Sequence, residues 1–347
     1  MTAVPDRSIE AQARARQNML TKPAGSLGRL EDLACWLAAR LGDVAPAMPR
    51  CEIFVFAADH GVATRGVSAY PQSVTEQMVH NFTRGGAAIN VLARLADARI
   101  EVVDVGVASD EPTPSGAREA RLGRGTRDLS REPAMTAAQV TQAFEIGARC
   151  VEESYSRGAR LLIAGEMGIG NTTAAACLIC AFTGSSPADV VGRGTGIDDP
   201  VLALKRAVVA SALQRMNVDA KSAPLGVLAE VGGFELATIT GLYLAAAKRG
   251  VPVVLDGYLS AAAALTAVAI EPKSRDWMLA SHLSTELGHA IALRALELEP
   301  LLDLKLRLGE GTGAALSLQI VRAALALHRE MATFAQAGVS GPAEAGS

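Results

Sequence analysis

The chain has 347 residues, of which 50% are hydrophobic and 20% are charged, and its formal net charge is −3. This length and composition are typical of a globular, enzyme-sized protein whose core fills one large domain or two. The small net charge, and the lack of a Lys/Arg stripe with interleaved aromatic residues, argue against nucleic acid as a partner.

The N-terminal stretch MTAVPDRSIEAQARARQN has no apolar segment of the kind found in secretory signals. The longest apolar runs, AAACLICAF and LSAAAALTAVAI, are shorter than the roughly 18 residues that a membrane span needs. The sequence has five cysteines without framework spacing, so we expect a cytoplasmic protein. Cys177 and Cys180 form a CxxC in an apolar, Ala-rich helical stretch, which favours buried core thiols over redox or metal chemistry.

Residues 8–42 are predicted to be helical, with a break at TKPAGS (21–26). Strand and helix signals alternate after this region. The predicted strands are EIFVFAAD (52–59), RIEVVDVGV (99–107), and the starts of RLLIAGEMGIGNTTAAACLICAF (160–182) and VPVVLDGYLSAAAALTAVA (251–269). The predicted helices are VTEQMVHNF (74–82), GAAINVLARLA (86–96) and the remainders of the last two segments. This alternation predicts an α/β fold with a parallel sheet and helices on both faces.

The polar, Pro-containing stretch 108–135 interrupts this alternation, and we expect it to be an excursion or lid between strands. Helical segments return near the C-terminus, so the two ends of the chain are expected to pack together. The predicted domains are a small helical domain, residues 1–48 with 295–347, and a large α/β domain, residues 49–294. Within the small domain, 338–347 is expected to be disordered.

Polar and Gly-rich loops follow the predicted strands, where open parallel sheets bind ligands. The loop GEMGIGNTT (165–173) could cradle a phosphate, because glycine N–H groups and a helix N-terminus can converge on an anion. Taken alone, it could also be a plain tight turn. It is not a P-loop, since no Lys-Ser/Thr pair follows, and Thr173 replaces the third Gly of a dinucleotide fingerprint. Thr172 and Thr173 could also cap the helix.

A second Gly-rich loop, VVGRGTGIDD (190–199), strengthens the phosphate hypothesis, since Arg193 adds a positive charge. Lys205 could add another, or it could be a solvated helix cation. The remaining strand ends carry Asp59, His60 and Gly61 after the first strand, and Asp256, Gly257 and Ser260 after VPVVL.

Two other polar clusters have open interpretations. His282, Glu286 and His289 are spaced so that they could share one helical face, but we expect helix-end packing or a polar wall rather than a metal site. The segment GVSAYPQSVTEQM (66–78) could form a pocket for a flat apolar ligand, or be a loop whose Ser or Thr residues cap a helix. The candidate residues of this segment are Tyr70, Ser73, Gln77 and, for capping, Thr75.

The stretch RLGEGTGAAL (307–316) places one carboxylate, Glu310, between Gly309 and Gly311. Glycine occurs where the backbone needs unusual torsions or approaches a ligand closely. Glu310 could therefore belong to a solvated turn, or it could be a base directed into a cavity.

Several long motifs resemble one family. In chain order they are KPAGSLGRLE (22–31), AADHGV (57–62), GVSAYPQSVTEQMV (66–79), GGAAINVLAR (85–94), GEMGIGNTTAAA (165–176), VGRGTGID (191–198), VLDGY (254–258), SHLSTELGH (281–289) and LRLGEGTGAAL (306–316). From about residue 8 to 335, the sequence resembles the nicotinate-nucleotide–dimethylbenzimidazole phosphoribosyltransferase family. The resemblance implies a Rossmann-like large domain, a small helical domain, and a homodimer in which the partner helps to close each site.

The resemblance also implies a reaction and its site residues. Nicotinate mononucleotide would donate its 5-phosphoribosyl group to 5,6-dimethylbenzimidazole, in the synthesis of the cobalamin lower ligand, with Glu310 as the catalytic base and Glu166 assisting. The implied phosphoribosyl- and nicotinate-binding residues are Gly165, Met167, Gly168, Ile169, Gly170, Asn171, Thr172, Gly192, Arg193, Gly194, Lys205 and Asp256. The implied base-binding residues are Tyr70, Ser73, Gln77, Leu308, Gly309 and Gly311.

This chemistry suits a single carboxylate. The donor's pyridine nitrogen is already cationic, so it leaves as a neutral group without a general acid, and only the proton of the attacking benzimidazole must be removed. We expect no cofactor and no metal. A nucleotide-dependent oxidoreductase is the alternative enzyme, but it needs the missing fingerprint Gly. A phosphate-ligand sensor is the non-enzymatic alternative, and it leaves Glu310 without a role.

Overall fold

The structure, a computed structural model, describes residues 1–194 and 196–340. Contacts within the chain divide it into two compact units. The larger unit contains Met1–Ala3 and Cys51–Ser317, and the smaller unit contains Val4–Arg50 and Leu318–Ser347.

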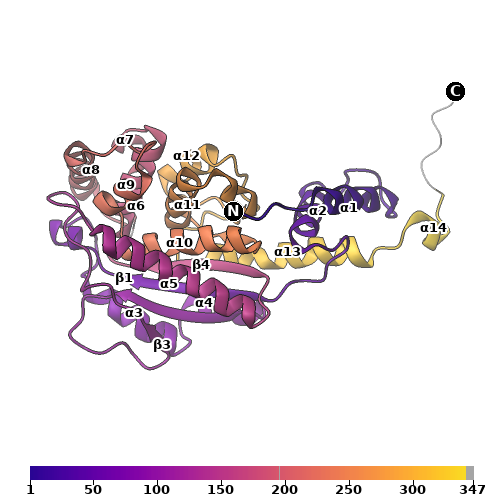
Figure 1. Ribbon diagram of the computed structural model, residues 1–347, viewed down its shortest axis with the longest axis horizontal. Helices are drawn as coiled ribbons and strands as arrows, with labels where there is room; N and C mark the ends of the chain where they lie inside the picture. Colours follow the sequence, from indigo (N-terminus) through magenta and orange to yellow (C-terminus); the bar gives the residue numbers. More distant parts are fainter. Residues whose placement is uncertain (195, 341–347) are drawn as a thin grey trace. The chain divides into compact units, whose positions relative to one another are not determined.

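A six-stranded parallel sheet, in the order β3-β2-β1-β4-β5-β6, forms the centre of the larger unit (Figure 1). The strands are β1 Cys51–Ala58, β2 Arg99–Gly106, β3 Ala117–Glu119, β4 Leu161–Met167, β5 Val253–Leu255 and β6 Met278–Ala280. The predicted α/β fold with a Rossmann-like parallel sheet is confirmed. Strand order reverses between β1 and β4, and such a reversal opens a ligand crevice at the carboxyl ends of the strands.

Helices connect these strands. In the larger unit they are α3 Ser73–Thr83, α4 Ala88–Leu95, α5 Ala137–Ser156, α6 Asn171–Thr183, α7 Pro187–Val190, α8 Asp199–Arg215, α9 Pro224–Val231, α10 Phe234–Arg249, α11 Tyr258–Ile270, α12 Leu287–Ala295, and the short 3₁₀ helices η1 Gly61–Arg65 and η2 Pro272–Trp277. Helix α13, Thr312–Glu330, begins in the larger unit. With this strand order, the right-handed crossovers that are general for parallel strands put α3 and α4 on one face of the sheet and α5, α10 and α11 on the other.

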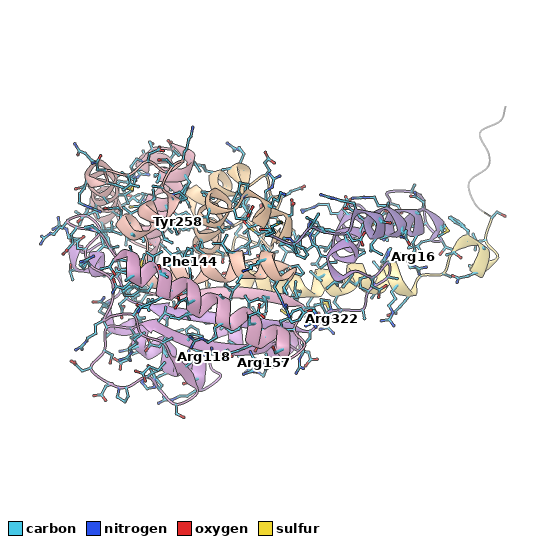
Figure 2. The ribbon with its side chains drawn as sticks, viewed as in Figure 1. Arg16, Arg118, Phe144, Arg157, Tyr258 and Arg322 are labelled. Atoms are coloured by element: carbon cyan, nitrogen blue, oxygen red, sulfur yellow. The ribbon has the colours of Figure 1, made fainter. Side chains whose placement is uncertain are left out.

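Small residues let the core pack closely without many aromatic rings. Helices α5 and α10 meet at two glycines: a Cβ on Gly147 would lie 2.3 Å from the Thr238 carbonyl oxygen, and one on Gly241 would lie 2.5 Å from the Cα of Phe144. Figure 2 labels Phe144 on α5. All five cysteines are free and buried, which confirms the prediction of core thiols for the CxxC. Among the described residues, no helix is long and apolar enough to cross a membrane.

The excursion at 108–135 is tied to the ends of β1 and β2. The Arg121 guanidinium pairs with Asp104 of β2 at 2.7 Å, and the Gly61 N–H donates to the Thr126 carbonyl at 3.0 Å. Strand β3, which the sequence did not predict, lies within it. The excursion is therefore an ordered extension of the sheet edge.

The boundaries between the units differ from the predicted ones at both ends of the chain, and Met1–Ala3 belong to the larger unit. The smaller unit resumes at Leu318 rather than at 295. Residues 295–317 stay with the larger unit because the N–H groups of Leu301 and Leu302 donate to the Ser281 carbonyl, both at 3.0 Å. This segment contains the Glu310 loop.

The smaller unit is helical. It contains α1 Arg7–Met19, α2 Arg29–Leu41, most of α13 and α14 Phe334–Ala337. The predicted break TKPAGS separates α1 from α2, and a 2.7 Å ion pair joins Lys22 to Glu31 across this break. Gly338 caps α14, and the Val339 N–H donates to the Phe334 carbonyl at 3.1 Å. The rest of the stretch predicted to be disordered, from 341 onwards, lies outside the described residues.

Candidate active site

A cavity of about 660 Å³ lies within the larger unit, at the carboxyl ends of β4 and β5. Six segments line it: the end of β4 with the turn into α6, the loop between α7 and α8, the start of α11, the loop between β6 and α12, the strap before α13, and the start of α3 with the loop before it. The lining residues are Tyr70, Val74, Met78, Glu166, Met167, Gly168, Ile169, Asn171, Thr172, Gly194, Asp256, Gly257, Tyr258, Leu259, Ser260, His282, Ser284, Glu286, Lys305, Leu306, Arg307, Leu308, Gly309 and Glu310. Figure 2 labels Tyr258 at the start of α11.

Glu310 is a buried carboxylate in this wall, not a residue of a solvated turn. It is only 5% exposed, and its Oε2 has no hydrogen-bond partner among the described residues. Burial raises its pKa to about 6, with a smaller contribution from the charge of Asp256, while a hydrogen bond from the Ile89 backbone acts in the opposite direction. A carboxylate with this pKa is largely ionised near neutral pH and still basic enough to accept a proton.

The Glu310 loop has an unusual backbone. Glu310 itself has a positive φ of 63°, between Gly309 at 84° and Gly311 at 90°. A non-glycine residue rarely adopts such a torsion, and it persists only where the surroundings enforce it. Two neighbouring groups enforce it here, Gly165 and Asp256.

Gly165 and Asp256 both hold the loop, Gly165 by close packing and Asp256 by hydrogen bonds. A Cβ on Gly165 would lie 2.2 Å from the Glu310 carbonyl oxygen, so the loop rests directly on the β4 backbone. The Asp256 carboxylate accepts the N–H of Gly311 at 3.1 Å and that of Ala314 at 3.0 Å. These bonds satisfy N–H groups at the start of α13, which otherwise lack partners within the helix.

Glu166 lies next to Glu310 but has a different electrostatic environment. It is buried, accepts a hydrogen bond from the Asn171 side chain, and accepts another from the Glu310 backbone. Burial, followed by the charges of Glu235, Asp256 and Glu310, raises the pKa of Glu166 well above its usual value. Two neighbouring acids with different pKa values suit different roles, one as a base and one as a neutral hydrogen-bonding group.

Lys205 is not a solvated helix cation. It is 2% exposed, and its Nζ donates to Thr172 Oγ1 at 2.7 Å. Burial lowers its pKa to about 8, while the charge of Glu286 acts in the opposite direction. Thr172 lines the cavity, so a buried ammonium group lies directly behind the cavity wall.

Arg193 makes contacts that the sequence did not predict. Its guanidinium donates to the Ile197 carbonyl at 2.8 Å and forms an ion pair with Asp199, and it is not among the lining residues. Arg307 lines the cavity instead and donates to the Gly194 carbonyl at 2.9 Å. Sequence reasoning missed Arg307, although it is part of the same LRLGEGTG motif as Glu310.

The structure brings twelve of the predicted site residues together in the cavity wall. These are Tyr70, Glu166, Met167, Gly168, Ile169, Asn171, Thr172, Gly194, Asp256, Leu308, Gly309 and Glu310. The other predicted residues lie outside the lining: Ser73, Gln77, Gly165, Gly170, Gly192, Arg193, Lys205 and Gly311. Among these, Gly165, Gly311 and Lys205 contact lining residues directly. The binding roles of all of them stay predictions.

Two predictions about helix caps are wrong. Helix α3 has Gln72 at its N-cap and no side-chain cap, because Thr75 Oγ1 donates to Asp59 instead, at 2.7 Å. Helix α6 has Gly170 at its N-cap, again without a side-chain cap, and Thr172 accepts from Lys205. In both helices, tertiary contacts compete with the local cap for the hydroxyl group.

The three polar residues singled out in the SHLSTELGH motif do not share a helical face; they are His282, Glu286 and His289. Helix α12 begins only at Leu287, with Glu286 as its N-cap, and His282 forms an isolated bridge with Leu302. His289 Nδ1 accepts the Ser284 N–H at 2.8 Å, and burial lowers the His289 pKa to about 3. His282 and Glu286 line the cavity, so this motif contributes part of a polar wall.

A family model and several known proteins resemble this chain over nearly its whole length. A family model described as Phosphoribosyltransferase, DBI_PRT, matches residues 2–339. The nicotinate-nucleotide–dimethylbenzimidazole phosphoribosyltransferase of Chromobacterium violaceum is 53% identical over 336 residues, which are 97% of each chain. The enzyme of that name from Chloroflexus aggregans is 51% identical over 340 residues, covering 98% of this chain and 96% of its own. A crystal structure of the Thermus thermophilus enzyme of that name superposes with a TM-score of 0.91 at 48% identity, covering 97% of this chain and all of that chain.

Proposed function

The chain belongs to the nicotinate-nucleotide–dimethylbenzimidazole phosphoribosyltransferase family, and from this premise we propose that it transfers the 5-phosphoribosyl group of nicotinate mononucleotide to 5,6-dimethylbenzimidazole. The products are nicotinate and α-ribazole 5′-phosphate, with inversion at the anomeric carbon. This reaction supplies the lower ligand of cobalamin.

The observation that carries the proposal is the Glu310 carboxylate. Its Oε2 has no partner among the described residues, it lies in the cavity wall, and its pKa is raised to about 6. In the reaction, the bond between the anomeric carbon and the pyridinium nitrogen breaks, and its electron pair neutralises that nitrogen. One benzimidazole nitrogen bonds to the carbon, and Glu310 accepts the proton that the other nitrogen loses. One base is therefore sufficient, whereas glycosidases need two acids.

Glu166 has a supporting role in this proposal. Its raised pKa favours a neutral carboxyl group, which can donate a hydrogen bond to the donor ribose. A second carboxylate beside Glu310 would raise the Glu310 pKa further through like-charge repulsion. A neutral Glu166 avoids this, so Glu310 remains the group that accepts the proton.

The donor phosphate is proposed to bind at the Gly-rich turn before α6. Lys205 and Arg307 are the cations near this part of the wall, the first through Thr172 and the second through Gly194. The N-terminus of α6 adds backbone N–H groups and a favourable dipole. The flat base is proposed to contact Tyr70 and Leu308, which also line the cavity.

Assembly and location are further parts of the proposal. Tyr70 and Leu308 line the cavity yet are 53% and 59% exposed, so a second copy of the chain that covers the cavity mouth would bury apolar surface. We propose a homodimer on this ground and from the family resemblance.

A cytoplasmic location is also part of the proposal, because the free, buried cysteines suit a reducing compartment. The larger unit is assigned the phosphoribosyl transfer.

Incubation with nicotinate mononucleotide and a panel of bases tests the function directly. The panel contains 5,6-dimethylbenzimidazole, other benzimidazoles, adenine and phenolics, and mass spectrometry identifies the products. We expect α-ribazole 5′-phosphate and free nicotinate in equal amounts. Absence of any ribotide product with every base would refute the proposal, and light scattering of the same sample determines the oligomeric state.

A further inference from the structure

A buried His–Glu pair lies outside the cavity lining and has no role in the mechanism above. His60 and Glu235 are both 0% exposed, and His60 Nε2 lies 2.7 Å from Glu235 Oε1. His60 Nδ1 and Glu235 Oε2 have no hydrogen-bond partner among the described residues. A buried pair with unsatisfied atoms is a poor source of stability, because the cost of desolvation offsets the attraction. Stability alone therefore does not account for it.

The His60 ring lies behind the donor turn, which we define as residues 167–170. A Cβ on Gly170 would lie 3.3 Å from the His60 Cβ, and one on Gly168 would lie 3.5 Å from the His60 Cδ2. On the other side of the ring, a Cβ on Gly233 would lie 2.3 Å from His60 Cε1. The imidazole thus fills the space between the donor turn and the start of α10.

The opposite side of the donor turn faces the cavity. Met167, Gly168 and Ile169 line the cavity, whereas His60 and Glu235 do not. The pair therefore cannot touch a substrate in the cavity directly. It can act only through the backbone that it supports.

Asp59, the neighbour of His60, supports the same turn by hydrogen bonds. Its Oδ1 accepts from Thr75 Oγ1 at 2.7 Å, and that hydroxyl oxygen accepts the Ile169 N–H at 3.1 Å. The two consecutive residues of the AADHGV motif thus support the donor turn in two ways, Asp59 through Thr75 and His60 by packing.

Glu235 also acts electrostatically on the site. After burial itself, the charge of Glu235 contributes most to the raised pKa of Glu166, ahead of Asp256 and Glu310. Glu235 belongs to the first turn of α10, and it holds the His60 ring by Nε2. It therefore connects the orientation of the ring with the environment of Glu166.

We propose that His60 and Glu235 are positioning residues that hold the donor turn in its binding conformation. The inference rests on the proposed function in one respect, the assignment of the nucleotide donor to this turn. A rigid turn places the ribose against the attacking nitrogen, and misplacement by about 1 Å can cost on the order of 10²-fold in rate.

Steady-state kinetics with separate variation of donor and base test the proposal. In His60→Ala we expect the KM for nicotinate mononucleotide to rise about 10-fold or more and kcat to fall, while the KM for the base changes little. His60→Gln keeps an amide donor near the position of Nε2, so it should recover part of the loss. Glu235→Gln keeps the shape of the pair and serves as the second variant if His60→Ala does not fold.

Glu52→Gln is the matched control. Glu52 is buried at the other end of the same strand, β1, where it pairs with Arg157 at 2.8 Å. The Glu52→Gln substitution should lower the melting temperature and leave the KM values for the donor and for the base unchanged. An unchanged donor KM in His60→Ala and Glu235→Gln, or equal changes in the two KM values, would overturn the proposal.

Amide hydrogen exchange separates this inference from the proposed function. In the ligand-free protein, residues 167–171 should exchange faster in His60→Ala than in wild type, and at the wild-type rate in Glu52→Gln. Unchanged protection of 167–171 in His60→Ala would overturn the inference. If wild type shows no turnover with nicotinate mononucleotide, the proposed function fails, and the exchange measurement decides the role of the pair.

Discussion

The backbone of Glu310 lies directly on the Cα of Gly165, so closely that a methyl group on Gly165 would lie 2.2 Å from the Glu310 carbonyl oxygen. Strand β4 thereby sets the position of the proposed base. Real Cβ atoms do not approach a carbonyl oxygen this closely, so any side chain at 165 must displace the loop.

Gly165→Ala should therefore lose most of its turnover. Displacement of the Glu310 loop by about 1 Å is expected to lower kcat on the order of 10²-fold, and overpacking should cost about 1–3 kcal/mol of stability. Gly147→Ala is the control, since its Cβ would lie 2.3 Å from the Thr238 carbonyl oxygen at the contact of α5 and α10. The control should lose stability but keep its kcat per folded molecule. Wild-type kcat in Gly165→Ala would contradict the argument.

Glu310→Gln should keep the fold and donor binding but lose turnover. The amide has nearly the same shape and cannot accept the benzimidazole proton, and loss of a general base typically costs about 10²–10⁴-fold in rate. Measurements of kcat, donor affinity and melting temperature on the purified variant check this. More than half of the wild-type rate would show that another group is the base.

The rate should depend on pH through Glu310. Its folded pKa is raised to about 6, and the ionised form is the active base. The rate at saturating donor should therefore be constant above this pKa and fall as pH drops through about 6. Because Glu310→Gln removes the titrating group, its residual rate should lack this limb. An unchanged acidic limb in Glu310→Gln would assign the titration to another group, such as Glu166 or Asp256.

Chelators should leave the activity intact. The pyridine leaves as a neutral group, so its departure needs no Lewis acid, and His289 Nδ1 is already occupied by the Ser284 N–H. Activity is measured after dialysis against EDTA, with and without added divalent ions. Loss of activity that a single divalent ion restores would reverse this expectation.

Long strands and the Gly-flanked acid could be predicted from the sequence, because their signals are local. Strand β1 has eight residues, all of them buried, and all except Glu52 are apolar. Strands β3 and β6 have three residues each, too few for a periodic pattern. The Glu310 loop could be singled out because glycines flank a single carboxylate, and the structure shows positive φ at all three residues.

Tertiary partners could not be predicted, because nothing in the local sequence encodes them. His60 and Glu235 are 175 positions apart, so neither residue points to the other. Arg193 was a reasonable phosphate ligand from its Gly-rich neighbours, but Asp199 and the Ile197 carbonyl already bind its guanidinium. Arg307 lies between apolar residues, and only the folded strap brings it to the cavity.

The donor phosphate should contribute to catalysis as well as to binding. Nicotinic acid riboside, which lacks this phosphate, should show kcat/KM lower by orders of magnitude, because binding energy remote from the reacting carbon can lower the barrier when it orients the ribose. The ratio of kcat/KM between nucleotide and riboside is measured in wild type, Lys205→Met and Arg193→Ala. Removal of a cation that holds the phosphate should lower this ratio, because only the nucleotide carries the phosphate. Equal efficiency of the two donors in wild type would refute the phosphate site.

Lys205 adds a pH signature to the same experiment. Burial lowers its pKa to about 8, so the ammonium form is present below this value and is lost as pH rises through it. The preference for the nucleotide over the riboside should therefore decline above about pH 8 in wild type and be independent of pH in Lys205→Met. Arg193→Ala should keep the decline, since a guanidinium stays charged over this range. If the preference still declines with pH in Lys205→Met, a group other than Lys205 causes the decline. If the ratio of kcat/KM between nucleotide and riboside is unchanged in Arg193→Ala, only Arg193 is excluded from the phosphate site.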